Sequence, residues 1–469
     1  MQNNKKWIHF LGICGRGTAG IARVMKKNGN YVTGSDQGVY PPMSDYLDRE
    51  QIKYFKEYNA DHIDENMDLV VIGGNALHVD PHNVEVERAR ELGIAIIAWP
   101  ELLAQNIMKD ESVVVAGTYG KTTISALLVT ILQKANFDPS YMIGESILGL
   151  EHNCESTLSN YSVVEGDEHP TLGYSTKPKF SYFPPKYLIL TSALWDHANI
   201  YLTEDEFVAV FVDLVRALPV DGFIVADKQG KNLDRILENA KCRVIYFNND
   251  NNKVNHIEND EQDGMTVDLK LENSSISLRT HLFGLHNANN ILAASICAYH
   301  LGVDLEVIGK AIKDFRGIKG RLELKYDGKV KIYHDVGQHP GKARGAIEAI
   351  RWKFSKEKIL VVLDPQASVL HDRESLNWYE MGGWEKVNEV WLSQLIHRSK
   401  SESGRVSAGE IVREIAKVQA NVKYFPLDIQ LVFNIVNSIK FGEFQVVLIL
   451  SSGGWRGLWQ PLLDDVKKI

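Results

Sequence analysis

The sequence contains few cysteines and no long apolar run, and each absence excludes some classes of protein. The 469 residues include only four cysteines, which are far apart and form no C-x-x-C pair. This spacing fits neither a disulfide framework nor a zinc site, and it suits a reducing compartment. No segment approaches the ~20 apolar residues that a membrane-spanning helix needs.

An excess of positive charge is missing as well. The formal net charge is −8 at pH 7, which argues against a nucleic-acid partner because phosphate backbones require clustered Lys and Arg. An anionic small molecule remains possible, since a local positive pocket can lie on an acidic protein. The start "MQNNKKWIHFLG" leads into an apolar run without a leader pattern, so we expect a cytoplasmic protein with no membrane partner. The sequence allows a monomer or a homodimer.

Short apolar runs alternate with helical patterns along most of the chain. The runs are four to eight residues long and rich in Val and Ile, which is typical of parallel strands covered on both faces. They are "KWIHFLG", "DLVVIGG", "GIAIIAW", "SVVVAGT", "KYLILTS", "GFIVAD", "RVIYFN", "KILVVLD", "EVWLSQL" and "FQVVLIL". This alternation predicts the α/β class.

The pattern divides into three α/β domains in series, at residues 1–109, 110–322 and 323–469. The first begins with a glycine turn and ends in a helix around "PELLAQNIMKD". The second contains the only clear antiparallel pattern, "MTVDLKLENSSISLRTHLFG", with a hairpin expected around Glu272-Asn273-Ser274. The polar stretch "NNDNNKVNHIENDEQDG" before it predicts a solvated loop. The third domain starts near "GRLELKYDG" and supplies three more strand–helix units.

A phosphate-binding loop is indicated by "VVVAGTYGKTTISALL", residues 113–128. The usual G-x-x-x-x-G-K-[ST] form would need a glycine at Val115, and Gly117 follows two residues later. Backbone N–H groups of the glycine turn and the helix start can bind phosphate oxygens. Lys121 can neutralise the outer phosphates, and the Thr122 hydroxyl can ligate Mg²⁺.

Acidic and imidazole groups follow two of the predicted strands. Glu165 ends the run "YSVVE" and is followed by Asp167 and Glu168, while Asp196 and His197 follow "LILTSALW". Groups at the carboxyl edge of a parallel sheet lie beside the phosphate site, where they can hold Mg²⁺. The sequence therefore predicts a metal-assisted phosphoryl-transfer site.

A second glycine turn occurs at the start of the chain, in "WIHFLGICGRGTAGIARVMKKNGNYVTGSD". Gly12, Gly15 and Gly17 follow G-x-x-G-x-G and not the G-x-G-x-x-G dinucleotide fingerprint. Asp36 lies about 20 residues further on, where an acidic residue can bind a ribose. A nicotinamide dehydrogenase is the alternative, but Arg16 within the turn suits a diphosphate of another kind.

These pieces together resemble the Mur ligase family of cytoplasmic amide-forming enzymes. "GTYGKTT" matches the family loop, which has no glycine at the earlier position, and "FGLHNANNILAA" resembles its G-x-H-N-x-x-N-x-x-A stretch. "GIKGRLE", "HDVGQHPGKARGAIEAIR" and "LSSGGWRGL" resemble later family segments in the same order. Tyr119, Gly166, Asn199 and Gln338 depart from the family pattern. The resemblance implies an N-terminal Rossmann-like UDP-binding domain, a central P-loop ATPase domain and a C-terminal Rossmann-like domain.

Site residues follow from this resemblance. The UDP-sugar substrate would contact residues of the first glycine turn and its surroundings together with a histidine of the third domain: Gly12, Cys14, Gly15, Arg16, Gly17, Ser35, Asp36, Asn75 and His339. ATP would lie on Gly117, Thr118, Tyr119, Gly120, Lys121, Thr122 and Thr123, with His286, Asn287, Asn290, Arg321 and Asp335 completing its site. Mg²⁺ would be held by Thr122, Glu165 and His197. Lys121, Glu165, His197 and Arg321 would be catalytic.

The implied reaction is an ATP-dependent ligation. "VTGSDQGVYPPMSDYL" resembles most closely the family members that recycle cell-wall fragments. These join the lactyl carboxylate of UDP-N-acetylmuramate to the peptide L-alanyl-γ-D-glutamyl-meso-diaminopimelate through an acyl phosphate. Members that add L-alanine instead are one alternative, and a paralogue that binds UDP-sugar or ATP without ligating is another.

Overall fold

The structure, a computed structural model, describes residues 5–195, 200–260, 264–366, 368–396 and 404–469. The chain divides into two compact units. The first comprises Met1–Ile257, Thr266–Thr280 and Asn287–Arg316, and the second comprises Glu258–Met265, His281–His286 and Gly317–Ile469. Within the described ranges, no helix combines the length and the apolar character needed to cross a bilayer.

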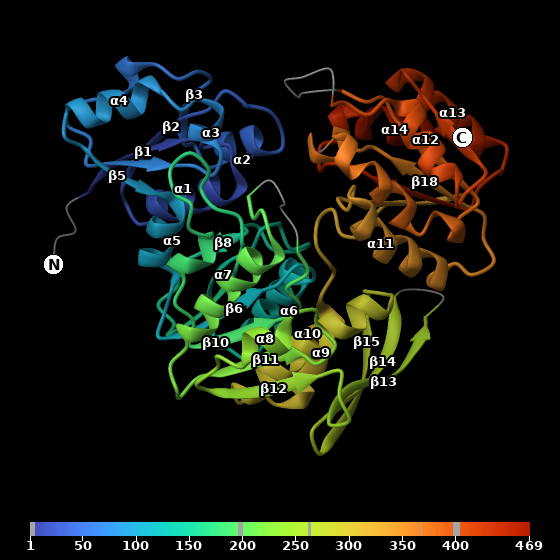
Figure 1. Cartoon of the computed structure of the whole chain (residues 1–469), viewed down its shortest axis with the longest axis horizontal. Coiled ribbons are helices and arrows are strands. Elements are labelled where there is room, and N and C mark those ends of the chain that lie inside the picture. Colours follow the sequence, from blue (N-terminus) through green and yellow to red (C-terminus); the bar gives the residue numbers. More distant parts are fainter. Residues whose placement is uncertain (1–4, 196–199, 261–263, 367, 397–403) are drawn as a thin grey trace. The chain divides into compact units, whose positions relative to one another are not determined.

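A parallel five-stranded sheet begins the first unit (Figure 1). Its order, β3-β2-β1-β4-β5, places β1 where the strand order reverses, and ligands bind at the carboxyl ends of strands at such a point. The strands are β1 (Trp7–Leu11), β2 (Tyr31–Ser35), β3 (Lys53–Phe55), β4 (Leu69–Ile72) and β5 (Ala95–Ala98). The helices are α1 (Arg16–Lys27), α2 (Met43–Arg49), α3 (Ala76–Val79), α4 (Val84–Glu91) and α5 (Trp99–Ile107).

A seven-stranded sheet follows, in the order β12-β11-β10-β6-β9-β7-β8. Only the β7–β8 pair is antiparallel among its described strands. Its strands are β6 (Glu111–Ala116), β7 (Ser140–Met142), β8 (Cys154–Glu155), β9 (Tyr161–Glu165), β10 (Tyr187–Leu190), β11 (Phe223–Asp227) and β12 (Arg243–Phe247). The associated helices are α6 (Lys121–Lys134), α7 (Glu204–Arg216), α8 (Leu233–Leu237), α9 (Leu285–His300) and α10 (Leu305–Asp314). The middle of β6 is fully buried, as expected for a central strand.

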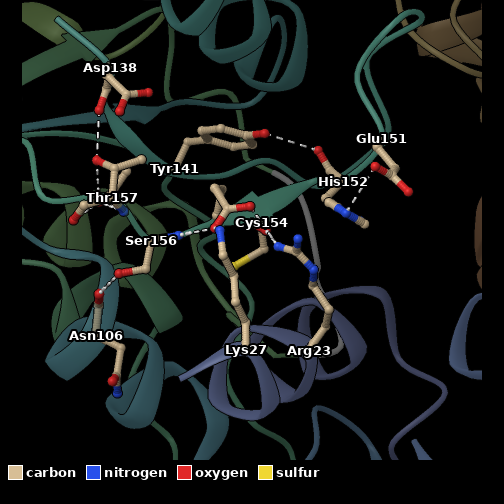
Figure 2. A network of polar contacts seen from close by, with 12 residues as sticks. Arg23, Lys27, Asn106, Asp138, Tyr141, Glu151, His152, Cys154, Ser156 and Thr157 are labelled. Carbon is tan, nitrogen blue, oxygen red and sulfur yellow. Dashed lines mark hydrogen bonds and ion pairs between the residues drawn. The ribbon is translucent and has the colours of Figure 1, made fainter. Parts of the chain in front are cut away.

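Helix α1 joins the two sheets by packing against β8. A Cβ atom at Gly20 would lie 2.8 Å from the Cβ of Cys154, so the helix approaches the strand as closely as its backbone allows. Around this contact, the Arg23 and Lys27 side chains extend from α1 toward the strand that contains Cys154 (Figure 2). Both form ion pairs with the Glu155 carboxylate, at 2.7 and 2.6 Å. A single apolar cluster also includes buried residues of both sheets.

A three-stranded sheet, β13-β14-β15, includes the predicted hairpin. Because β14 (Met265–Leu271) ends and β15 (Ser274–Thr280) begins on either side of Glu272-Asn273, the expected turn is confirmed. The prediction of a solvated loop before it was wrong, since Asn252–Asn259 forms β13. Its side chains are mostly polar and partly exposed, so no apolar alternation marks the strand in the sequence.

The second unit contains a six-stranded sheet in the order β16-β17-β21-β18-β19-β20. The strands are β16 (Glu323–Asp327), β17 (Lys331–Asp335), β18 (Ile359–Leu363), β19 (Glu389–Leu392), β20 (Val422–Tyr424) and β21 (Val446–Leu450). The helices are α11 (Pro340–Lys353), α12 (Ala408–Ala416), α13 (Asp428–Lys440) and α14 (Trp459–Val466). The antiparallel β16–β17 pair, together with the antiparallel β7–β8 pair of the first unit, corrects the expectation of a single antiparallel patch. All ten predicted apolar strands are present, which confirms the α/β class.

Candidate functional site

The loop between β6 and α6 has the geometry of a phosphate cradle. Gly117 and Gly120 have φ angles of +124° and +80°, which favour glycine. A Cβ atom at Gly117 would lie 2.3 Å from the Thr191 hydroxyl oxygen, so no side chain fits there. The loop is tied to the segment after β10, because the Thr118 amide donates to the Ser192 carbonyl at 3.0 Å. Its backbone is thus fixed before any phosphate arrives.

Lys121 lies at the first position of α6 and points back over the loop. Its ammonium donates to the Gly117 carbonyl at 2.6 Å and to the Glu168 carboxylate at 2.8 Å. Burial alone would lower the pKa of Lys121, but the carboxylates of Glu168 and Asp167 outweigh it and raise the pKa. Lys121 therefore stays protonated beside the helix N-terminus, where its ammonium and the helix dipole can contact an anionic ligand.

Thr122 and Glu165 meet next to the cradle. The Thr122 hydroxyl donates to one carboxylate oxygen of Glu165 at 2.9 Å, and the Gly144 amide donates to the other at 2.7 Å. Burial raises the pKa of Glu165, against the opposing effect of Lys121. A hydroxyl and a desolvated carboxylate in contact form an oxygen donor set that suits Mg²⁺. The third predicted ligand, His197, lies outside the described residues, as do Asp196 and Asn199.

Two asparagine side chains of helix α9 lie at or near the same loop. A Cβ atom at Gly120 would lie 2.5 Å from the side-chain oxygen of Asn290, and the Asn290 amide donates to the Asn287 side chain at 3.3 Å. Both asparagines are buried, whereas Tyr119 is exposed and Thr123 is buried in the first turn of α6. His286 belongs to the first turn of α9 and is exposed.

A cavity of about 780 Å³ opens at the first glycine turn. Six of the predicted substrate residues line it: Gly12, Gly15, Arg16, Gly17, Asp36 and Asn75. Cys14 acts through its backbone, because its amide donates to the Asp36 carboxylate at 2.9 Å. Ser35 is fully buried, and its hydroxyl donates to the buried carboxylate of Glu85. Its side chain therefore supports the glycine turn through this buried hydrogen bond.

Other cavity residues were missed from the sequence. A Cβ atom at Gly17 would lie 2.6 Å from the ring of Trp99, so this glycine is required by packing against a residue 82 positions away. Lys179 lies 5.9 Å from the same ring and pairs with Asp167 at 2.7 Å. Burial raises the pKa of Asp167, but Lys179 and Lys121 outweigh it and lower the pKa to about 2. No local motif marks Trp99 or Lys179.

The second unit carries the remaining predicted nucleotide contacts. The Asp335 carboxylate ends β17 and accepts hydrogen bonds from the amides of Leu322 and Gly337 at 2.9 and 2.7 Å. Burial raises the pKa of Asp335, and Arg321 opposes that effect, so the two predicted residues lie within electrostatic reach of each other. His339 caps α11, because its Nδ1 accepts from the Gly341 amide at 3.2 Å.

A polar cluster lies at the carboxyl edge of the second unit's sheet. The Gln366 amide donates to the side-chain oxygen of Gln338 at 2.7 Å, and the Gln366 side chain donates to Asp364 at 2.9 Å. Arg456 contacts both Asp364 and Asp428 at 2.8 Å. Strands β17, β18 and β21 thus converge on groups that can bind a polar, charged molecule.

Comparison with known proteins gives two family matches along the chain. A model described as "Mur ligase family, catalytic domain" matches residues 7–110, and "Mur ligase middle domain" matches residues 115–298. A UDP-N-acetylmuramate–L-alanyl-γ-D-glutamyl-meso-2,6-diaminoheptandioate ligase of Escherichia coli is 28% identical over 98% of both chains. A UDP-N-acetylmuramate–L-alanine ligase of Syntrophomonas wolfei is 30% identical, over 88% of this chain and 87% of the relative. A murein peptide ligase structure from Psychrobacter arcticus superposes with a TM-score of 0.73 at 22% identity, over 99% of each chain.

Proposed function

The chain belongs to the Mur ligase family, and we propose that it is an ADP-forming ligase of cell-wall peptide recycling. Its acid substrate is UDP-N-acetylmuramate, and its amino substrate is L-alanyl-γ-D-glutamyl-meso-diaminopimelate. These are the substrates named for the Escherichia coli relative, which aligns over 98% of the chain. The long "VTGSDQGVYPPMSDYL" run, which includes Asp36 of the cavity, supports this branch of the family.

One observation carries the proposal: Asp167 lies both at the cavity of the glycine turn and among the charged neighbours of the phosphate-loop lysine. Asp167 lines the cavity and lies two residues from Glu165, which contacts Thr122. The negative charge of Asp167 also raises the pKa of Lys121. We infer that an acid held in the cavity directs its carboxylate past Asp167 toward the outermost phosphate of a nucleotide on the loop, where positioning would favour direct phosphoryl transfer.

Positioning and charge neutralisation account for the phosphoryl transfer. The loop amides and Lys121 would bind the phosphate oxygens and stabilise the charge that develops during the transfer. Thr122 and Glu165 would hold Mg²⁺, which neutralises charge on the phosphates when bound. The acid carboxylate would take the outer phosphoryl group of ATP to give an acyl phosphate and ADP, and the amino group would then displace phosphate and lose a proton to form the amide. Arg321, Asp335 and His339 belong to the second unit and stay predicted ligand contacts, and the six-stranded sheet of that unit would bind the amine.

The main alternative differs only in the amine. The Syntrophomonas wolfei relative, at 30% identity, is named for L-alanine, and it favours an L-alanine-adding enzyme with the same acid substrate. In both cases the substrates are small molecules, the cofactors are ATP and Mg²⁺, and the protein acts in the cytoplasm. The proposed domain boundaries, 1–109, 110–322 and 323–469, apply to both.

An assay of phosphate release with UDP-N-acetylmuramate and Mg²⁺-ATP distinguishes the tripeptide-adding from the L-alanine-adding ligase. We expect turnover with the tripeptide at least tenfold faster than with L-alanine at equal concentration. Faster turnover with L-alanine would favour the alternative. Binding of the UDP-sugar without turnover on either amine would indicate a paralogue that does not ligate.

A further inference from the structure

Three side chains outside every sequence motif lie close together near the contact between α1 and β8. They are Glu50, which follows α2, and Glu151 and His152, which precede β8. Figure 2 shows the Glu151 carboxylate and the His152 ring facing each other. One ligand atom from each of the three side chains, a carboxylate oxygen or a ring nitrogen, lies within 4.8 Å of the other two. All three residues belong to the first unit.

The Glu50 carboxylate and the Nδ1 atom of His152 face each other at 3.8 Å, which is too long for a hydrogen bond. Their side chains are only 18% and 11% exposed. The Nδ1 atom is buried and has no hydrogen-bond partner among the described residues. Arg49 and Arg23 approach the Glu50 carboxylate only to 3.5 and 3.7 Å. Polar groups buried in this way cost free energy unless a further ligand satisfies them.

The Tyr46 hydroxyl is a third polar group of this kind. Its oxygen is buried and has no hydrogen-bond partner in the part of the chain that the structure describes. The Tyr46 ring lies edge-on to the His152 ring, with 6.1 Å between the ring centroids. Burial raises the pKa of Tyr46, and the Glu50 carboxylate raises it further, so the hydroxyl is within electrostatic reach of Glu50. Three poorly satisfied polar groups therefore meet in one place.

A divalent transition cation suits this donor set. Two ligands of a tetrahedral Zn²⁺ ion, each about 2.0–2.1 Å from the metal, lie about 3.4 Å apart, which is close to the separation of the Glu50 oxygen and the His152 Nδ1. One imidazole nitrogen with two carboxylates favours zinc-class ions over Mg²⁺, which prefers oxygen ligands alone. Glu151 is 71% exposed and lies 3.5 Å from the His152 Nε2, so its carboxylate can turn toward the ion.

The neighbouring arginines do not take up the charge of the cluster. Arg23 lies closer to Glu155, at 2.7 Å, than to Glu50. Arg49 is exposed, so water screens its charge. The carboxylates of Glu50 and Glu151 thus provide two negative charges, which match those of a divalent cation.

We propose that Glu50, Glu151 and His152 bind one divalent cation of the zinc class, at a site that shares no ligand with the Mg²⁺ site of Thr122 and Glu165. This site goes beyond the proposed ligase reaction and does not depend on it. The bound cation links the end of α2, beside the five-stranded sheet, to the segment before β8 of the seven-stranded sheet. It stabilises the packing of the two sheets, because it binds the folded chain only, and it takes no part in phosphoryl transfer.

Titration of the untagged full chain with Zn²⁺, in competition with a chromophoric chelator and in excess Mg²⁺, tests the proposal. The excess Mg²⁺ fills the phosphate-loop site. We expect one Zn²⁺ per chain, with an affinity that falls at least about tenfold in His152→Gln and in Glu151→Gln. Co²⁺ in place of Zn²⁺ should give a visible absorption spectrum that His152→Gln abolishes, which a purely structural role of the histidine would not produce.

His82→Gln is the matched control, because the exposed His82 also lies 3.8 Å from a carboxylate oxygen, that of Glu87. Its Zn²⁺ affinity should equal that of the wild type. Glu151→Gln guards against misfolding, since its side chain is at the surface, and circular dichroism checks the fold of each variant. Absence of Zn²⁺ binding, its displacement by Mg²⁺, or an affinity unchanged in both Glu151→Gln and His152→Gln would refute the proposal.

Discussion

His334 makes the stability of the second unit depend on pH. It lies in β17, is 1% exposed, and its Nε2 donates to the Ser451 carbonyl at 3.2 Å. Its Nδ1 has no hydrogen-bond partner among the described residues, and Glu323 is 4.0 Å away. Burial lowers the pKa of His334 from 6.5 to about 4, with smaller contributions from its neighbours.

The direction in which the free energy of unfolding changes with pH depends on which state binds more protons. Below its ordinary pKa of 6.5 the unfolded chain protonates this histidine, whereas the folded chain resists protonation down to about pH 4. The unfolded state therefore binds more protons in this window, and the free energy of unfolding falls as the pH falls from 6.5 to 4. Between about pH 7.5 and about pH 5 the expected loss is about 2 kcal/mol.

Chemical denaturation at these two pH values, followed by tryptophan fluorescence, measures the effect. The Trp459 ring is 4.8 Å from the His334 ring, so it reports unfolding around the histidine. His334→Gln keeps a donor for Ser451 and should remove about 2 kcal/mol of the pH-dependent loss. His82→Gln is the control, because that side chain is 92% exposed. Equal pH dependence in wild type and His334→Gln would refute the reasoning.

Three further substitutions, one of them with a matched control, test other parts of the structure. Lys121→Ala should abolish phosphate release while leaving UDP-sugar binding measurable by calorimetry, and loss of both would mean that the two sites are not separate. Gly17→Ala would place a Cβ 2.6 Å from the Trp99 ring, so we expect UDP-sugar affinity to fall about tenfold. Gly345→Ala, which has open space around it, should not change that affinity. Phe211→Ala removes a buried ring packed 5.2 Å from Phe207 and should cost about 3–5 kcal/mol in denaturant unfolding.

Local sequence was sufficient for most strands and for the phosphate loop. Apolar runs such as 113–116 can be buried only between two covered faces, and β6 has β9 and β10 on its two sides. The absence of a glycine at Val115 also has a structural reason. Val115 lies inside β6 opposite Glu165 and Ile189, and its carbonyl accepts the Gly166 amide at 2.8 Å, so a glycine there would lie within the strand and not in the loop.

Long-range contacts explain what the sequence did not predict. Lys179, Trp99 and Glu145, which pairs with Arg16, reach the proposed site from positions far from any motif, and only the packing of the two sheets brings them there. Strand β13 was missed for a different reason. It is an edge strand of polar residues, and the apolar face of the small sheet comes from the alternation of β14.

The contact between α1 and β8 also bears on self-association. An exposed edge strand offers unpaired backbone groups to which a strand of another chain can add, and proteins avoid this by shortening or covering the edge. In the seven-stranded sheet β8 has two residues, and α1 lies against it with Gly20 in close approach. The helix that follows the first glycine turn thereby closes one edge of the neighbouring sheet to such strand addition.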